Sequence, residues 1–144
     1  MSENNSMSIL RLERLAFERI DYSRDILTDK KPSDYEMNFN REISTRDDKQ
    51  HFKVSLTANL WDKDSRSINL TVKLSGFFFC DCEDEELKKE LVQYNTLAIM
   101  FPYIRSQVSL ISTQPDMPPI IIPAVNIVGM FKEVDRNEAL KENP

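Results

Sequence analysis

Two stretches in the middle of the chain alternate strictly between apolar and polar residues. The first covers residues 52–60 and the second covers residues 68–75. Successive side chains of a strand point to opposite faces, so this period of two predicts strands with one buried face and one face in water. Residues 61–67 between them are polar and typical of a turn. The two stretches therefore predict an antiparallel hairpin.

The pattern is weaker in the N-terminal part of the chain. Residues 37–43 also alternate, but Arg41 breaks the apolar set, which predicts a strand at the edge of a sheet or one that enters a groove. Between residues 10 and 22 the apolar spacing fits one face of a helix better than a strand. Residues 25–34 are rich in turn formers and predict a crossover loop.

Gly76 interrupts the second alternating stretch directly before three consecutive phenylalanines, Phe77–Phe79. A glycine inside a strand indicates either a bulge or a close approach by neighbouring atoms. A bulge would shift the alternation and turn at least one aromatic ring away from the core. The alternative is that all three rings belong to a core strand.

A long helix is predicted after the strands. Apolar residues recur at spacings of three and four from Glu85 to about residue 111. The acidic run at residues 81–86 fits the start of this helix, because carboxylates are favourable near a helix N-terminus. Pro102 removes one hydrogen bond inside the pattern, which predicts a kink or a restart.

Residues 113–123, called the strap here, contain four prolines and are therefore predicted to be extended. Three consecutive isoleucines in the strap must cover apolar surface on this chain, on a partner or on a client. A second apolar stripe from Val125 predicts a shorter C-terminal helix. The polar ends, residues 1–8 and 137–144, are predicted to be a disordered N-terminus and a flexible tail, which leaves one domain at 9–136.

Composition narrows the class of protein. The chain has 144 residues, 40% of them hydrophobic and 30% charged, which fits one globular domain able to bury its own core. No apolar run approaches the roughly 20 residues that span a bilayer, and the start of the chain lacks the features of a secretory signal, so we expect a cytoplasmic protein without membrane insertion. The net charge of −5 argues against a nucleic-acid partner.

Few residues offer catalytic or metal-binding chemistry. Cys80 and Cys82 are two residues apart and predict free thiols at a strand end, with His51 as the only further classical zinc ligand. Asp62 and Asp64 lie in the predicted turn, where aspartate is common for conformational reasons. The chain has two glycines in all, too few for a glycine-rich phosphate loop. We therefore expect a binding protein rather than an enzyme, without cofactor or metal.

Two segments, Ile-Met-Phe-Pro-Tyr-Ile-Arg at residues 99–105 and the proline-rich residues 118–127, together resemble the SecB family of tetrameric export chaperones. Residues 99–105, Ile-Met-Phe-Pro-Tyr-Ile-Arg, are similar to the family's I-L-F-P-Y-A-R stretch, which places a proline inside a helix. Residues 118–127 follow the family's P-x-L-x-L-x-P-V-N-F pattern, except that Ala124 replaces a proline and Pro123 comes one residue earlier. Gly76 also stands where the family has glycine. The resemblance runs from about Leu10 to Val134.

The resemblance implies an α+β fold, a four-stranded antiparallel sheet covered on one face by the proline-containing helix and the C-terminal helix. It assigns residues 10–22 to the first strand, against the helical spacing noted above. It also implies a homotetramer built as a dimer of dimers. The implied activity is that of an ATP-independent chaperone, or holdase, which binds unfolded or precursor polypeptides for export. The tail that helps SecB engage the SecA motor is not evident, which puts a translocase motor partner in doubt.

A client groove is expected between the crossover at 25–34, the strap and the last helix, because unfolded chains need exposed apolar grooves. Eight apolar residues are the candidates for its lining: Leu27, Tyr35, Phe39, Ile120, Ile121, Ile122, Met130 and Phe131. For each, the alternative is an ordinary position in the core or in a subunit interface.

Three other functions stay open at this point. The chain is alternatively an adaptor that protects one dedicated partner, such as an aggregation-prone antitoxin. It is alternatively a small-molecule-binding domain, with the three phenylalanines and the sheet lining a pocket. The last alternative is an enzyme whose site has no recognisable sequence signature.

Overall fold

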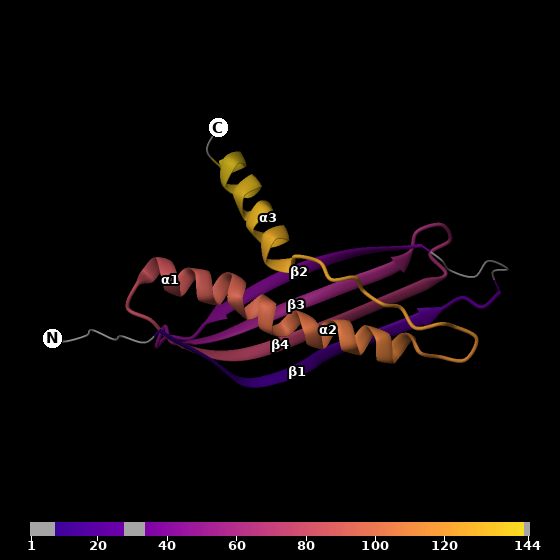
Figure 1. Ribbon diagram of the computed structural model, residues 1–144, viewed down its shortest axis with the longest axis horizontal. Helices are drawn as coiled ribbons and strands as arrows, with labels where there is room; N and C mark the ends of the chain where they lie inside the picture. The colour runs from indigo at the N-terminus through magenta and orange to yellow at the C-terminus, as the bar shows by residue number, and fades with distance from the viewer. Residues whose placement is uncertain (1–7, 28–33, 143–144) are drawn as a thin grey trace.

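The computed structural model describes residues 8–27 and 34–142. They form a four-stranded antiparallel sheet in the order β1-β4-β3-β2, with the helices on one of its faces (Figure 1). The strands are β1 (Ile9–Arg24), β2 (Tyr35–Thr45), β3 (His51–Asp62) and β4 (Ile68–Asp81). The expected α+β fold is confirmed. Residues 1–7 of the disordered segment expected at 1–8 and residues 28–33 of the crossover lie outside the described residues.

The central strands β3 and β4 follow the alternation of the sequence closely. Their apolar residues face the helices and are buried, whereas most of the residues between them are less buried. β3 and β4 pair in one unbroken register, from His51 opposite Phe79 to Trp61 opposite Asn69. The predicted hairpin is confirmed.

Strand β1 shows why the apolar spacing of its sequence imitates a helix. Its register against β4 shifts twice, between Leu12 and Arg14 and between Phe17 and Arg19. Each extra residue on the bulged strand moves the next inward side chain from spacing two to spacing three. The inward positions therefore fall at residues 10, 12, 15, 17, 20 and 22. The strand implied by the family resemblance is confirmed, and the helical interpretation is wrong.

Gly76 marks a close approach, and the proposed bulge there is wrong. Gly76 pairs in register with Leu15 on one side and Val54 on the other. A β-carbon at this position would lie 2.6 Å from Cε2 of Phe78 and 3.3 Å from the sulfur of Met100. Glycine is thus required because the Phe78 ring packs over its backbone. Phe77 and Phe79 point to the opposite face by ordinary strand alternation, so only one of the three rings is in the core.

The long helical segment has three parts, α1 (Glu85–Glu90), a π-helical turn η1 (Leu91–Asn95) and α2 (Thr96–Ser112). Asp84 caps α1, because its carboxylate accepts hydrogen bonds from the backbone N–H groups of Glu86 and Leu87 at 3.0 and 3.3 Å. The acidic run is therefore a helix start, as predicted. The helix does not restart at Pro102, which lies inside α2.

Pro102 is tolerated because it lies on the exposed side of α2. The carbonyl that loses its donor belongs to Ala98, four residues earlier, which is also exposed and thus open to water. The irregularity expected at the proline is found upstream instead, in η1. The carbonyl of Gln93 in that turn accepts a hydrogen bond from Nη1 of Arg41 at 3.2 Å, so β2 compensates the altered helix geometry.

The last helix, α3 (Ile127–Glu142), begins near β2 and projects away from the sheet (Figure 1). The side chain of Asn126 accepts a hydrogen bond from the backbone N–H of Gly129 at 2.9 Å, which is the geometry of a helix cap. α3 continues through residues 137–142, which the polar sequence predicted as part of a flexible tail.

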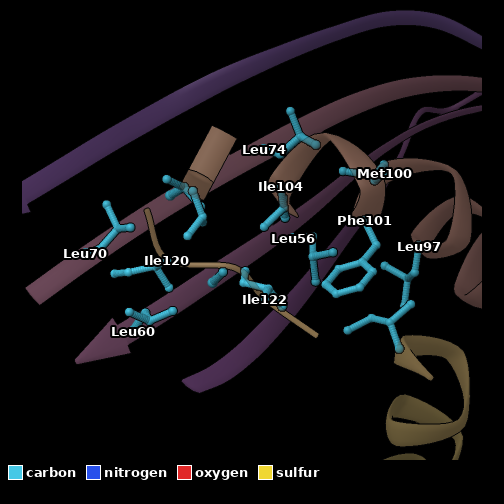
Figure 2. Close-up of a cluster of buried hydrophobic side chains, with 14 of the residues drawn as sticks. Leu56, Leu60, Leu70, Leu74, Leu97, Met100, Phe101, Ile104, Ile120 and Ile122 are labelled. Atoms are coloured by element: carbon cyan, nitrogen blue, oxygen red, sulfur yellow. The ribbon is translucent and has the colours of Figure 1, made fainter. Parts of the chain in front are cut away.

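The core lies between the helix-covered face of the sheet, α2 and the strap (Figure 2). Leu56, Leu70 and Leu74 rise from the central strands to meet Met100 and Ile104 of α2. Ile120 and Ile122 complete this cluster from above β3 and β4 (Figure 2). Part of the strap is thus a piece of the core, in agreement with the expectation that the isoleucines cover apolar surface.

Candidate binding surface

The described part of the chain exposes many large apolar side chains, and most of them belong to the helices, the strap and the end of β1. Twelve are exposed: Ile9, Ile20, Ile26, Leu27, Leu87, Ile99, Tyr103, Leu110, Ile121, Met130, Val134 and Leu140. Scattered apolar residues are normal on protein surfaces, but a series along neighbouring elements marks an interaction surface. Here the series follows α1 and α2, then the strap, and then α3.

The strap is pinned to α2 by polar bonds while its isoleucines alternate between core and solvent. The backbone N–H of Ile120 donates to Oγ of Ser112 at 2.7 Å, and its carbonyl accepts from Oγ of Ser109 at 3.1 Å. The carbonyl of Ile122 accepts from Nε of Arg105 at 3.1 Å. Ile120 and Ile122 are buried, but Ile121 between them is 73% exposed. These bonds fix an apolar side chain in water.

A groove of about 690 Å³ runs between α2 and the strap. Its apolar lining includes Pro102, Leu110, Pro119 and Ile121. Its polar lining comes from α2 and the residue after it: Arg105, Ser106, Ser109 and Thr113. The groove thus presents apolar contact area beside hydrogen-bonding groups, the combination that an extended polypeptide requires.

The eight residues expected to line a client groove do not form one surface. Leu27, Ile121 and Met130 are exposed. Ile120, Ile122 and Phe131 are buried in the core of this chain, because the strap and the start of α3 pack down onto the sheet. The two from β2, Tyr35 and Phe39, are half-buried against that core. Whether any of the eight contacts a client stays a prediction.

Sequence reasoning did not single out Leu110 or Pro119, two of the groove residues. Leu110 lies beyond the buried stripe of α2 and is 68% exposed. Its signal was present in the sequence, because an apolar residue outside the buried stripe of an amphipathic helix has no partner within that helix. Pro119 is recognisable in the sequence only as a breaker of helical structure, because no local pattern indicates which way it faces.

A hydrogen-bonded cluster holds the first half of α3 against β2 and η1. Nη2 of Arg41 lies 2.7 Å from Oδ1 of Asp135, and the hydroxyl of Tyr94 donates to Oδ2 of Asp135 at 2.6 Å. Burial alone would raise the pKa of Asp135, but the bonds from Arg41 and Tyr94 outweigh it and hold that pKa below its usual value. The guanidinium of Arg41 also lies over the Phe131 ring, 5.0 Å from its centroid. The first half of α3, up to Asp135, is therefore held in place against β2.

The open face of the sheet is polar and differs from the helix-covered face. Oγ of Ser55 and Oγ of Ser75 lie 2.8 Å apart, and Ser75 also donates to Glu18. The Lys53 ammonium, 2.6 Å from Oε1 of Glu18, is the main reason why the pKa of Glu18 falls to about 2. The Phe77 ring lies beneath Lys53 and Arg14 as a cation–π pair with each. The polar groups and the aromatic ring named here therefore have their interaction partners on the same face of the sheet.

The described residues contain no group of three or more His, Cys, Asp or Glu side chains placed to hold a metal ion. Cys80 and Cys82 are both buried as free thiols, and burial raises the pKa of Cys80, which makes it a poor nucleophile. His51 is held between Asp48, with Nδ1 2.5 Å from Oδ2, and Glu13, with Nε2 3.4 Å from Oε1.

A cavity beside His51 is lined by Phe77 and Phe78 but not by Phe79. Its volume of about 290 Å³ is near the lower limit for ligand pockets. In the part of the chain that is described, no helix is long and apolar enough to cross a membrane.

Comparison with known proteins agrees with this architecture. A family model described as preprotein translocase subunit SecB matches residues 3–138. The protein-export protein SecB of Dinoroseobacter shibae is 22% identical over 133 residues, which cover 89% of this chain and 77% of that protein. An uncharacterised protein of Methanocaldococcus jannaschii, MJ0357, is 33% identical over 76 residues. That match covers 53% of this chain and 48% of the archaeal protein, about half of its length.

A solved structure has the same fold. It is the Mycobacterium tuberculosis SecB-like chaperone Rv1957 in complex with a ChAD peptide from the HigA1 antitoxin. The TM-score is 0.65 at 13% sequence identity, over 81% of this chain and 87% of that chain. At this level of identity the likeness shows a shared fold.

Proposed function

The chain belongs to the SecB family, and from this premise we propose that it is an ATP-independent holdase that binds unfolded polypeptides in the cytoplasm. The observation that carries the proposal is the exposed apolar series beside the groove of about 690 Å³ between α2 and the strap. Ile121 is the centre of this surface, because three hydrogen bonds from α2 to the neighbouring residues hold this part of the strap in place. Holding a client by burial of apolar surface requires no nucleotide and no reaction.

The affinity for a client comes from several weak contacts. Burial of one large apolar client side chain contributes about 1.5–3 kcal/mol. Leu110 and Ile121 in the groove and Met130 on α3 offer separate contact points. An unfolded chain that reaches more than one of them gains avidity without any strong single contact. This mode of binding selects for apolar content and not for one sequence.

We also propose a homotetramer built as a dimer of dimers. The outer side of the long helical segment exposes Leu87, Ile99 and Tyr103, although the sheet already covers its inner side. A helix that is apolar on both sides needs a second partner, and another copy of the same chain supplies a self-complementary one. Tetramers multiply the number of client contacts by four.

Export clients are the first proposal for what is held, and a dedicated partner is the second. The Dinoroseobacter shibae relative is a protein-export protein. The Mycobacterium tuberculosis chaperone with the same fold was solved with an antitoxin peptide, which favours the second candidate. The two differ in breadth, because an export holdase protects unrelated unfolded chains and an adaptor protects one.

The test is suppression of aggregation of several unrelated unfolded proteins at near-stoichiometric ratios, followed by light scattering. Wild-type protein should suppress it, and Ile121→Asp should lose most of that effect because a carboxylate in the groove opposes burial. Asn40→Asp adds the same charge at an exposed position on the open face and should behave as wild type. Protection of one partner alone would favour the adaptor, and no protection at all would refute the proposal.

The assembly is tested separately by multi-angle light scattering. A tetramer has four times the 16.8 kDa mass of the chain. A monomer at micromolar concentration would refute the tetramer. Ile121→Asp should keep the wild-type mass, since Ile121 is proposed to meet clients and not a second copy.

A further inference from the structure

The strap has two edges of backbone polar groups, and contacts among the described residues use only the edge that faces α2. The N–H and carbonyl of Ile120 and the carbonyl of Ile122 all bond to side chains of α2, at 2.7, 3.1 and 3.1 Å. In an extended chain the N–H and C=O of one residue point to one side, and those of the next residue point to the other. The backbone groups of Ile121 therefore point away from α2.

These groups of Ile121 have no partner within the described residues. The side chain of Ile121 is 73% exposed as well, so nothing described covers this residue. A free N–H and a free C=O on one residue form the donor and acceptor pair that one residue of another extended chain complements.

The neighbours of Ile121 along the same edge are prolines. Pro119 and Pro123 are two residues away on either side, so their backbone nitrogens face the same way as that of Ile121. Proline has no N–H, which leaves Ile121 as the one donor on this edge between residues 119 and 123. Prolines on a strand edge prevent further strands from adding, because an open edge otherwise pairs with any extended chain.

We propose that Ile121 is a single-residue backbone clamp, at which one residue of an extended client exchanges both N–H···O=C bonds with the strap. This inference rests on the proposed holdase function and names how its site recognises a polypeptide. The occupant is an extended unfolded segment, because the partial charges of the free N–H and C=O complement a peptide backbone and no side chain is required. Pro119 and Pro123 restrict pairing to one residue, so that a client is held in extended form but does not build a sheet.

The direct test compares Ile121→Pro with Ile121→Val. Both shorten an apolar side chain, but only proline removes the N–H. The probe is a fluorescein-labelled synthetic peptide rich in leucine and phenylalanine, with binding followed by fluorescence anisotropy. Ile121→Pro should bind it about three- to tenfold more weakly than Ile121→Val, the effect of one lost hydrogen bond. The same peptide with N-methylated backbone amides should lose affinity for wild type by a similar factor.

A double variant is expected to act in the opposite direction, and it keeps the test valid if Ile121→Pro fails to fold. Pro119→Ala with Pro123→Ala adds two N–H donors to the open edge and should bind the peptide more tightly and release it more slowly. Pro118→Ala is the control, because its nitrogen lies on the opposite edge. Its release rate should match that of wild type.

The outcomes separate this inference from the proposed function. If Ile121→Asp weakens peptide binding while Ile121→Pro and the N-methylated peptide bind like their references, the contact is made by side chains alone and the clamp is refuted, with the holdase intact. If Ile121→Pro changes the oligomeric mass and leaves peptide affinity unchanged, the edge pairs two copies of this chain, which also refutes the clamp. If wild type binds no unfolded chain, both fail.

Discussion

The two faces of the sheet are stabilised by different kinds of interaction. The face toward α2 is dry, with Leu56, Leu70 and Leu74 fully buried and no polar bonds between them. The open face is connected by side-chain hydrogen bonds, such as Asn59 to Asn38 at 2.8 Å, and by ion pairs, such as Lys53 to Glu18 at 2.6 Å. Dry packing depends on volume and is indifferent to pH, whereas the open face depends on charge. The same strands therefore carry two sets of contacts with different sensitivities.

The largest expected difference between the faces comes from neighbouring residues of β3. Leu56→Ala should lower the free energy of unfolding by about 2–5 kcal/mol, because it opens a cavity in a core with no other atoms to fill it. Thr57→Ala, one residue later on the open face, should change it by about 0.5 kcal/mol or less. Urea denaturation measures both. Equal losses of unfolding free energy at the two positions would contradict this difference between a face stabilised by apolar packing and a face stabilised by polar contacts.

An intermediate effect is expected at Gly76, where the dry face is too crowded for a β-carbon. Gly76→Ala should destabilise by about 1–3 kcal/mol, since the added methyl group would lie 2.6 Å from the Phe78 ring. Gly76→Ala combined with Phe78→Leu should recover part of that loss by removing the obstructing ring atoms. A double variant that is as unstable as the sum of the two single variants would show that the methyl group acts by another route.

The smallest effect is expected on the open face, and it depends on pH. The pKa of Glu18 is about 2 in the folded chain, below the ordinary value of 4.5, so its contacts stabilise the fold above pH 4.5 and lose that contribution as pH falls toward 2. Glu18→Gln should therefore lower the urea midpoint at pH 6, and this difference should shrink below pH 4.5 and be much smaller at pH 2.5. High salt should reduce the difference at pH 6. A difference that is constant with pH would contradict a charged role for Glu18.

How far the sequence predicts this fold depends on whether an element is regular. β3 and β4 are predicted well because each has one buried face and no bulge. β1 is misread from its own pattern because the two bulges produce the spacing of a helix, and only the resemblance in residues 99–105 and 118–127 assigns it correctly. At Gly76 the sequence left two alternatives open, a bulge or a close approach, since local sequence does not show which ring packs over the glycine.

The candidate surface is less predictable than the fold for a physical reason. Ile120, Ile121 and Ile122 are chemically identical, and the difference between buried and exposed comes from which carbonyls Arg105 and Ser109 hold. Those bonds join residues that are more than ten positions apart, so a local pattern does not contain them. The positions of the prolines can be read from the sequence. Which edge of the strap each proline nitrogen faces depends on the direction of the backbone, which only the structure shows.

The π turn η1 makes the rotation of α2 about its own axis depend on the number of residues that precede it. A π turn holds one residue more than an α-turn, and one residue corresponds to a rotation of about 100° around the helix axis. The extra residue between Leu91 and Asn95 therefore sets which side of α2 faces the sheet relative to α1. Deletion of a single residue there, with every apolar side chain retained, would turn Leu97 and Ile104 away from the core. In this fold, the count of residues before a helix carries as much information as their chemistry.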